Sequence, residues 1–139
     1  MSLDRSEPGD AVSRLGLGPG LVVQELGWDD DVDDALRQAI MDTIDADLIG
    51  ESEEAVDVVL LWLRQSDGDV MDVLIDALTD LSAAGYIWVL SPKVGCPGHI
   101  GQADLAEGAA AGGLALTSSA VVSQNWSAHK VVRPKASRR

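Results

Sequence analysis

The chain has 139 residues, the size of one domain, and 46% of them are apolar, which is enough for a buried core. Its formal net charge of −13 disfavours contact with phosphate backbones, so we exclude DNA as a partner. One cysteine excludes an intramolecular disulfide, and the sequence shows neither an apolar signal segment nor a membrane span, so we expect a cytoplasmic protein with no membrane partner.

The two ends of the chain differ in composition from its middle. Residues 1–13 are polar and contain Pro8 and Gly9, which predicts a disordered tail. Residues 14–134 carry the apolar patterns of a single domain. Residues 135–139 form a basic tail, and the last ten residues hold five of the ten basic residues of the chain.

The first half of the domain predicts two strands around one helix. A valine-rich run bounded by glycine, residues 21–27, indicates a strand. Apolar residues recur at three- and four-residue steps over residues 29–44, which indicates an amphipathic helix. A short edge strand is expected around Leu48 and Ile49. Residues 56–63 are apolar at nearly every position, as in a central parallel strand that is covered on both faces.

A second helix and a third strand follow. Helical spacing over residues 67–81 predicts a helix that Asp67 or Asp69 caps at its start. Gly85 is expected just after the end of this helix, where glycine is common. Residues 86–92 are mostly apolar and indicate the third strand.

The rest of the domain predicts a third helix and a closing hairpin. Ile100, Leu105 and Ala109 indicate the helix, and residues 115–125 and 127–134 indicate the two hairpin strands. The element order β-α-β-α-β-α-β-β predicts the α/β class, as a small three-layer sandwich with a mainly parallel sheet and right-handed crossovers. We expect the C-terminal antiparallel hairpin to add one antiparallel strand at an edge.

Four segments, VVQELGWDDDVDD, DVVLLWLR, GYIWVLSPK and NWSAHKVVRPK, resemble a family of small uncharacterised bacterial proteins, mainly from actinobacteria, that is catalogued as a domain of unknown function. With their spacing they cover most of the chain from about residue 15 to residue 135. The resemblance implies a cytoplasmic single domain and no assigned activity. The element order also resembles a shortened nucleotide-binding (Rossmann-like) or methyltransferase-like sheet in its last strands and helix.

A cluster of aspartates follows the first strand, where a nucleotide-binding fold has its glycine-rich phosphate loop. The cluster consists of Asp29, Asp30, Asp31, Asp33 and Asp34. A single glycine, Gly27, remains there. Two like charges 4 Å apart cost about 1 kcal/mol in water and about 4 kcal/mol at an intermediate dielectric, so a pyrophosphate is disfavoured and we expect no cofactor. Asp29 or Asp30 is expected to cap the following helix.

Two kinds of metal site share part of this pattern. A calcium loop needs glycine at its sixth position and glutamate at its twelfth, where the chain has Asp34 and Ile40. Residues 30–34 fit the Asp-Asp-x-x-Asp pattern of prenyl-diphosphate enzymes, which are large helical proteins, unlike this chain. Generic divalent binding stays open, and we assign no metal ligand. Because a helix cap needs fewer carboxylates, the excess indicates an exposed acidic face for a protein partner of unknown identity, with a basic protein as the candidate.

Other candidate side chains lie in predicted loops. Lys93, Cys96 and His99 follow the third strand and supply a cation, a thiol and a base, of which Cys96 and His99 would be a nucleophile and its base. They match no known signature, so an ordinary loop is the preferred interpretation. Trp28 and Trp126 are candidates for a pocket or a protein contact, although a core position is favoured for each.

Three hypotheses for the function follow. The preferred one is a non-catalytic protein-interaction or regulatory module that uses its acidic face. The alternative is a small-ligand-binding or degenerate methyltransferase-like domain with its site near Trp28, Lys93 and Trp126. The third is a hydrolase or transferase that uses Cys96 and His99.

Overall fold

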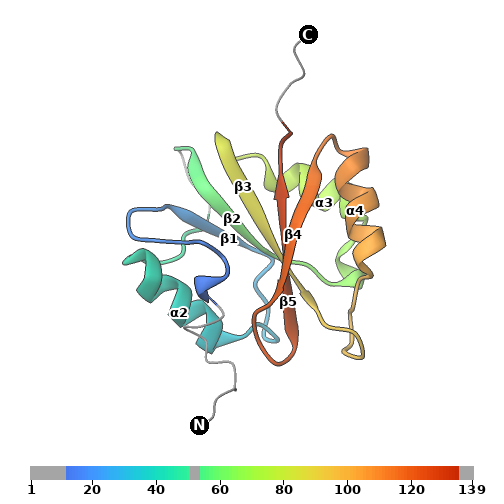
Figure 1. The fold of residues 1–139 in the computed structure, drawn as a ribbon, viewed down its shortest axis with the longest axis horizontal. Coiled ribbons are helices and arrows are strands. Elements are labelled where there is room, and N and C mark those ends of the chain that lie inside the picture. The colour runs from blue at the N-terminus through green and yellow to red at the C-terminus, as the bar shows by residue number, and fades with distance from the viewer. Residues whose placement is uncertain (1–11, 51–53, 135–139) are drawn as a thin grey trace.

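The computed structural model describes residues 12–50 and 54–134, which form a five-stranded sheet with helices on both faces (Figure 1). The strands stand in the order β1-β2-β3-β5-β4. Their bounds are Val23–Leu26 for β1, Val56–Trp62 for β2, Leu81–Pro92 for β3, Ala115–Val121 for β4 and Trp126–Val132 for β5. This arrangement confirms the predicted α/β class.

The sheet is parallel on one side and antiparallel on the other. Strands β1, β2 and β3 are parallel, whereas β5 runs antiparallel to both β3 and β4. The prediction that the antiparallel strand lies at an edge is wrong, because β4 is the edge strand and β5 lies inside the sheet. The crossover after β3 places β4 two positions away, and the final strand turns back along β4 to fill the gap.

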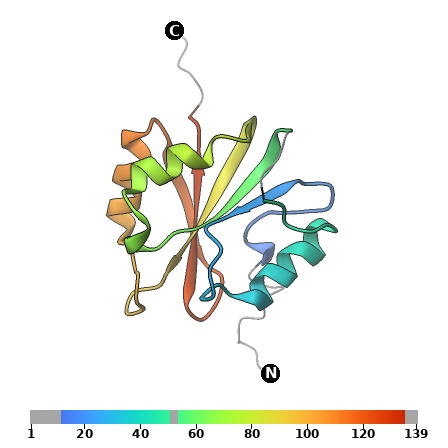
Figure 2. The ribbon, with the colours of Figure 1, turned by 180° about the vertical axis from the view of Figure 1, so that it is seen from behind.

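Helices cover both faces of the sheet, as the three-layer prediction requires. Helix α2 (Asp34–Ile44) packs on one face, and helices α3 (Val70–Ala77) and α4 (Gln102–Ala111) pack on the other (Figures 1 and 2). A short 3-10 turn, η1 (Gln65–Asp67), connects β2 to α3.

Helix α2 lies on the opposite face from α3 because the chain first moves outward from β1. After α2, Ile49 forms a parallel bridge with Gln24 on the outer side of β1. The backbone N–H of Glu25 donates to the Ile49 carbonyl at 2.7 Å, and the N–H of Ile49 donates to the Val23 carbonyl at 3.0 Å. The chain then returns past β1 to form β2. Right-handed crossovers that run in opposite directions place their helices on opposite faces.

Strand β2 contributes to both cores, as its continuous apolar sequence predicts. Its residues point alternately to the two faces, and the side chains of this strand are buried at almost every position. The core under α2 includes Val58, Leu60, Trp62, Leu36, Ile40 and Ile44. The core under α3 and α4 includes Val59, Leu61, Leu63, Leu74, Leu105 and Ala109.

The start of α2 differs from the prediction. The helix begins at Asp34, and its N-cap is Asp33, which accepts a hydrogen bond from the backbone N–H of Leu36 at 2.9 Å. The predicted caps, Asp29 and Asp30, lie before this point because the residues that precede the helix form a separate hydrogen-bonded turn.

The end of α3 also differs from the prediction. The helix ends at Ala77, and Leu81 already pairs with Val56 in the sheet. Gly85 therefore lies within β3 and does not follow a helix. A Cβ atom at Gly85 would be 2.7 Å from the carbonyl oxygen of Asp57, so this glycine permits the close approach of β3 to β2.

The packed domain extends to Val12, which is buried beside Leu15 and lies two residues before the predicted start. The remainder of the predicted N-terminal tail, residues 1–11, and the basic tail, residues 135–139, lie outside the described residues. No helix within residues 12–50 and 54–134 is long and apolar enough to cross a membrane.

Candidate functional site

The carboxyl ends of β1 and β2 form the switch point of the sheet. The chain that leaves β1 crosses toward the outer edge of the sheet, where Ile49 pairs beside β1. The chain that leaves β2 crosses in the opposite direction, to β3. Open α/β sheets bind ligands in the crevice at the carboxyl ends of their strands at such a point. The residues that follow β1 and β2 therefore determine what this crevice can bind.

Gly27, directly after β1, is required by the packing of two strands. Its φ angle is +79°, and a Cβ atom there would lie 2.3 Å from the carbonyl oxygen of Trp62. Any other residue would strain the backbone and clash with β2. The one glycine that this segment shares with a phosphate loop thus has a structural explanation without a ligand.

The crevice between β1 and β2 contains the side chain of Arg64, which is 10% exposed. Its guanidinium donates to the carbonyl oxygens of Gly27 at 2.8 Å and Trp62 at 3.2 Å. It also binds both carboxylate oxygens of Asp31, with 3.0 Å between Nε and Oδ2. Nη1 lies 3.2 Å from Oδ2 of Asp67. Groups that would otherwise face a ligand here are therefore bonded to one another.

The ion pair fixes the charge of both partners. The hydrogen bond from Arg64 holds the pKa of Asp31 below its usual value, and the same bond raises the pKa of Arg64. The guanidinium carbon of Arg64 also lies 5.5 Å from the ring centroid of Trp126, in a cation–π contact. Gly98 leaves room for this side chain, because a Cβ there would be 3.1 Å from Cβ of Arg64.

Arg37 of α2 neutralises a further carboxylate in this region, that of Glu25 near the end of β1. The Nε and Nη2 atoms of Arg37 donate to Glu25 at 2.6 and 2.8 Å, and the indole N–H of Trp62 donates to Glu25 at 2.9 Å. The Glu25 side chain is only 9% exposed. Its charge is therefore matched where it is buried.

Three of the five clustered aspartates have structural roles. Asp31 pairs with Arg64, and Asp33 caps α2. Asp34 lies 3.3 Å from Nη1 of Arg37, with its side chain 81% exposed. The cluster is thus not a uniform acidic face, because its members act at different places in the fold.

The other two aspartates, Asp29 and Asp30, are exposed. The side chain of Asp29 accepts a hydrogen bond from the backbone N–H of Asp30 at 2.7 Å. Within the described part of the chain, no group of three or more His, Cys, Asp or Glu side chains is placed to hold a metal ion.

Trp28 lies on the surface with 55% of its area exposed, so the core position favoured for it from the sequence is wrong. It lines a hollow of about 370 Å³ between the ends of β1 and β2 and the flank of α3. Three carboxylates line the same hollow: Asp29, Asp67 and Asp76. An aromatic ring is therefore exposed among acidic side chains.

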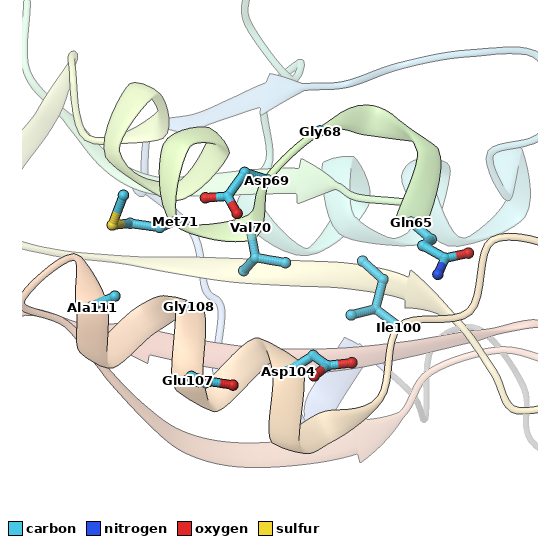
Figure 3. Close-up of a pocket in the computed structure, with 10 residues that line it drawn as sticks. All are labelled: Gln65, Gly68, Asp69, Val70, Met71, Ile100, Asp104, Glu107, Gly108 and Ala111. Carbon is cyan, nitrogen blue, oxygen red and sulfur yellow. The ribbon is translucent and has the colours of Figure 1, made fainter.

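A second hollow, of about 570 Å³, lies on the other flank of α3, facing α4 (Figure 3). Its apolar lining includes Val70, Met71 and Ile100. Its carboxylates are Asp69, Asp104 and Glu107. Asp69 is also the N-cap of α3, as one of the two predicted caps, and accepts from a backbone N–H at 3.3 Å.

The three candidates after β3 do not converge on one site. The thiol of Cys96 lies 3.8 Å from Oδ1 of Asn125, whereas Nδ1 of His99 lies 2.9 Å from the carbonyl oxygen of Pro92. Cys96 and His99 line two different cavities. The backbone N–H of Lys93 donates to the Asn125 carbonyl at 2.9 Å.

Trp126 is a core residue, as the sequence favoured, with 4% of its area exposed. Its ring meets the ring of Trp62 edge-on, with 4.8 Å between the centroids. It is the first residue of β5 and not a loop residue, and its contact with Arg64 links the core to the crevice.

Sequence reasoning missed Arg64, which the structure places at the centre of the crevice. A signal was available, because Arg37 and Arg64 are the two basic residues among eighteen acidic ones between Glu25 and Asp80. Arg64 also directly follows the apolar run of residues 58–63. An isolated cation at that place is expected to find a carboxylate partner.

Known proteins support both parts of the predicted resemblance, beginning with the sequence family. The family described as "Protein of unknown function (DUF3052)" matches residues 12–135. Uncharacterized protein Rv2239c of Mycobacterium tuberculosis is 46% identical over 124 residues, which cover 88% of this chain and 78% of that protein. Uncharacterized protein Mb2263c of Mycobacterium bovis shows the same identity and coverage.

Solved methyltransferases share the fold. The mitomycin 7-O-methyltransferase MmcR has a TM-score of 0.62 and 13% identity, over 92% of this chain and 53% of that one. The CcbJ methyltransferase of Streptomyces caelestis has a TM-score of 0.60 and 12% identity, over 93% and 90%. The O-methyltransferase NcsB1, solved with S-adenosylmethionine, has a TM-score of 0.60 and 15% identity, over 88% of this chain and 50% of that one. The chain spans about half the length of MmcR and NcsB1, and these identities show the fold alone.

Proposed function

We propose that this chain, which belongs to the DUF3052 family of proteins of unknown function, is a non-catalytic binding module for a basic segment of a partner protein. One observation carries the proposal: six carboxylates surround α3 in two hollows, next to an exposed tryptophan. We call these carboxylates and Trp28 the acidic surface; the carboxylates are Asp29, Asp67, Asp69, Asp76, Asp104 and Glu107.

Charge complementarity favours a basic partner for the acidic surface. Arg64 is the one basic residue among the described residues that line the two hollows, and its guanidinium is bonded to Asp31, Asp67 and backbone carbonyls. Its charge therefore offsets Asp67 alone among the carboxylates of the acidic surface, and the other five have no basic partner among the described residues that line the two hollows. A field of one sign attracts ligands of the opposite sign and raises their association rate.

Trp28 supplies the specific contact that a charged surface lacks. A half-exposed indole beside carboxylates can stack with an arginine or lysine side chain, because the ring attracts a cation and the carboxylates pair with it. Tryptophan is also enriched at the energetic centres of protein interfaces. The partner segment is therefore expected to place a basic residue on Trp28 and other basic residues in the two hollows.

The filled crevice favours this function over a small-ligand or methyltransferase-like one. The fold likeness to NcsB1, which was solved with S-adenosylmethionine, is the observation that supports the second candidate. A ligand that approached the Gly27 and Trp62 backbone at the switch point would have to displace Arg64 from these carbonyls and from Asp31. Losing the half-exposed Asp31–Arg64 pair costs about 1–2 kcal/mol, which the ligand would have to supply together with the lost bonds to the two carbonyls. The lone cysteine supports a reducing, cytoplasmic compartment for the module.

The test is isothermal titration with a synthetic basic peptide. The sequence KVVRPKASRR, residues 130–139, is a convenient probe because it combines five basic residues with two valines. We expect binding that weakens at least about tenfold between about 50 and 500 mM salt. We also expect Trp28→Ala and the double change Asp104→Asn/Glu107→Gln each to weaken it.

A charge-matched control variant distinguishes binding at the acidic surface from attraction by the net charge of the protein. Asp42→Asn/Asp47→Asn removes two charges from a hollow at the far end of α2. That variant should bind the peptide as tightly as the unchanged chain. Equal losses in the two double variants would mean that only overall charge attracts the peptide, and the proposal would be wrong.

A further inference from the structure

A small cavity of about 190 Å³ lies beside the start of α4, on the face of the sheet that α3 and α4 cover. The lining residues come from β3, β5, α4 and the loop that precedes α4. They are Ser91, Pro92, Val94, His99, Ile100, Gln102, Ser127 and His129. Within the described part of the chain, the lining thus contains several hydrogen-bonding groups and no Asp or Glu, although the full sequence has 23 acidic residues.

Ser91 presents an unpartnered buried hydroxyl in the lining of this cavity. The residue is 1% exposed, and within the described residues its Oγ is a buried side-chain atom with no hydrogen-bond partner. Its neighbour across the strands is Ser127 of β5, which faces the same side. A buried hydroxyl without a partner costs about 1–3 kcal/mol. A ligand that accepts from Ser91 would remove this cost.

The imidazoles of His99 and His129 supply further hydrogen-bonding groups to this cavity. Nδ1 of His99 lies 2.9 Å from the Pro92 carbonyl, which only accepts, so Nδ1 carries the proton and Nε2 remains for a ligand. Nδ1 of His129 lies 2.8 Å from Oγ of Ser119, which fixes the ring and leaves Nε2 for the cavity. Burial, and then the nearby His99, lower the pKa of His129, an effect that an anion between the rings would oppose.

Helix α4 adds backbone donors. It has ten residues and begins at Gln102, which lines the cavity, and its N-cap Gly101 supplies no side-chain acceptor. The free N–H groups of a first turn and the helix dipole favour an oxyanion. Asp104, in the same turn, lines the hollow between α3 and α4 instead (Figure 3), so its carboxylate does not face this cavity.

We propose that this cavity binds a protonated phosphate group, held by the two serine hydroxyls, His129 and the amino end of α4. Its unprotonated oxygens accept from these donors, and its P–OH donates to Nε2 of His99. Sulfate carries no proton near neutral pH and would leave that nitrogen unpaired, so the site should prefer phosphate. The volume suits one tetrahedral anion or the end of a small phosphomonoester.

The experiment is an NMR titration that follows the imidazole resonances of His99 and His129 in phosphate-free buffer. Inorganic phosphate should cause saturable shifts of both rings and raise the pKa of His129. Sulfate should bind at least about tenfold more weakly. Titration with glycerol phosphate distinguishes the free phosphate ion from a phosphomonoester as the ligand. Saturable shifts with both glycerol phosphate and inorganic phosphate would identify a phosphomonoester. Saturable shifts with inorganic phosphate alone would identify the free ion.

Ser91→Ala tests the site itself. Because Oγ of Ser91 has no partner among the described residues, the change removes no hydrogen bond of the fold and should leave stability equal or higher. We expect phosphate affinity to fall about tenfold in this variant. Ser118→Ala, at an exposed position of β4, should bind phosphate like the unchanged chain. Absent saturation, equal affinity for sulfate, or unchanged affinity in Ser91→Ala would overturn the proposal.

Discussion

Changing the clustered aspartates to alanine one at a time should separate them by role, with Asp31 the most costly. Asp31 accepts two hydrogen bonds from the buried Arg64, and bonds to charged groups contribute about 1.5–3 kcal/mol. Because the Asp31 side chain is 53% exposed and Arg64 keeps Asp67 and two carbonyls, solvent screening reduces the expected loss. We expect Asp31→Ala to lower the free energy of unfolding by about 1–2 kcal/mol.

The other members of the cluster should matter less, in a defined order. Asp33→Ala removes the N-cap of α2 and should cost about 1 kcal/mol. Asp34→Ala removes an exposed pair with Arg37 and should cost about 0.3 kcal/mol. Asp30→Ala, at an exposed position, should change stability by less than about 0.5 kcal/mol.

The assay is urea unfolding followed by tryptophan fluorescence, with a common slope for all variants. Because Arg64 lowers the pKa of Asp31, the carboxylate stabilises the fold above its usual pKa of 3.8, and this contribution is lost as the pH falls through the lower folded value. The difference between the unchanged chain and Asp31→Ala should therefore be constant near neutral pH and shrink below about pH 4. Equal losses for Asp30→Ala and Asp31→Ala would refute this reasoning.

Three further predictions concern the crevice and the buried histidine. Gly27→Ala should cost at least about 3 kcal/mol in urea unfolding, because it adds a clash with Trp62 to a positive φ, whereas Gly113→Ala, with positive φ and open space, should cost about 1 kcal/mol. Millimolar S-adenosylmethionine should leave the melting temperature unchanged. A dose-dependent rise in the melting temperature would show that the ligand binds in the crevice and displaces the Arg64 side chain. Because the pKa of His129 is lowered in the folded chain, the unfolded chain binds a proton first as the pH falls through about 6.5. The free energy of unfolding should therefore decline in this pH range, and it should decline less steeply in His129→Gln. Parallel curves of unfolding free energy against pH for the two proteins would contradict this.

Elements with strong periodicity were predictable from the sequence. The stripe of α2 and the apolar run of β2 determine which residues meet in the core, and both were read correctly. Gly85 was misread because glycine serves equally at a helix end and at a close approach of strands, and only the neighbouring strand distinguishes the two. The position of β5 depends on pairing across the sheet, which local pattern does not encode.

The candidate site was less predictable because its contacts join residues far apart in the chain. The Asp31–Arg64 pair spans thirty-three positions, and neither spacing nor composition specifies the partner. For the same reason the cluster was read as one acidic face, although Asp31 and Asp33 serve the fold. Ser91 looked like an ordinary strand residue, since its unpartnered state depends on β5 and the loop before α4.

Binding of a basic segment to the acidic surface can be mapped directly by backbone NMR while the KVVRPKASRR peptide is titrated into the protein at low salt. We expect the shifts to concentrate on residues 27–29, η1, the start of α3 and the exposed side of α4. Shifts that spread evenly over all acidic regions, including the far end of α2, would contradict this expectation, because they would show attraction by net charge alone.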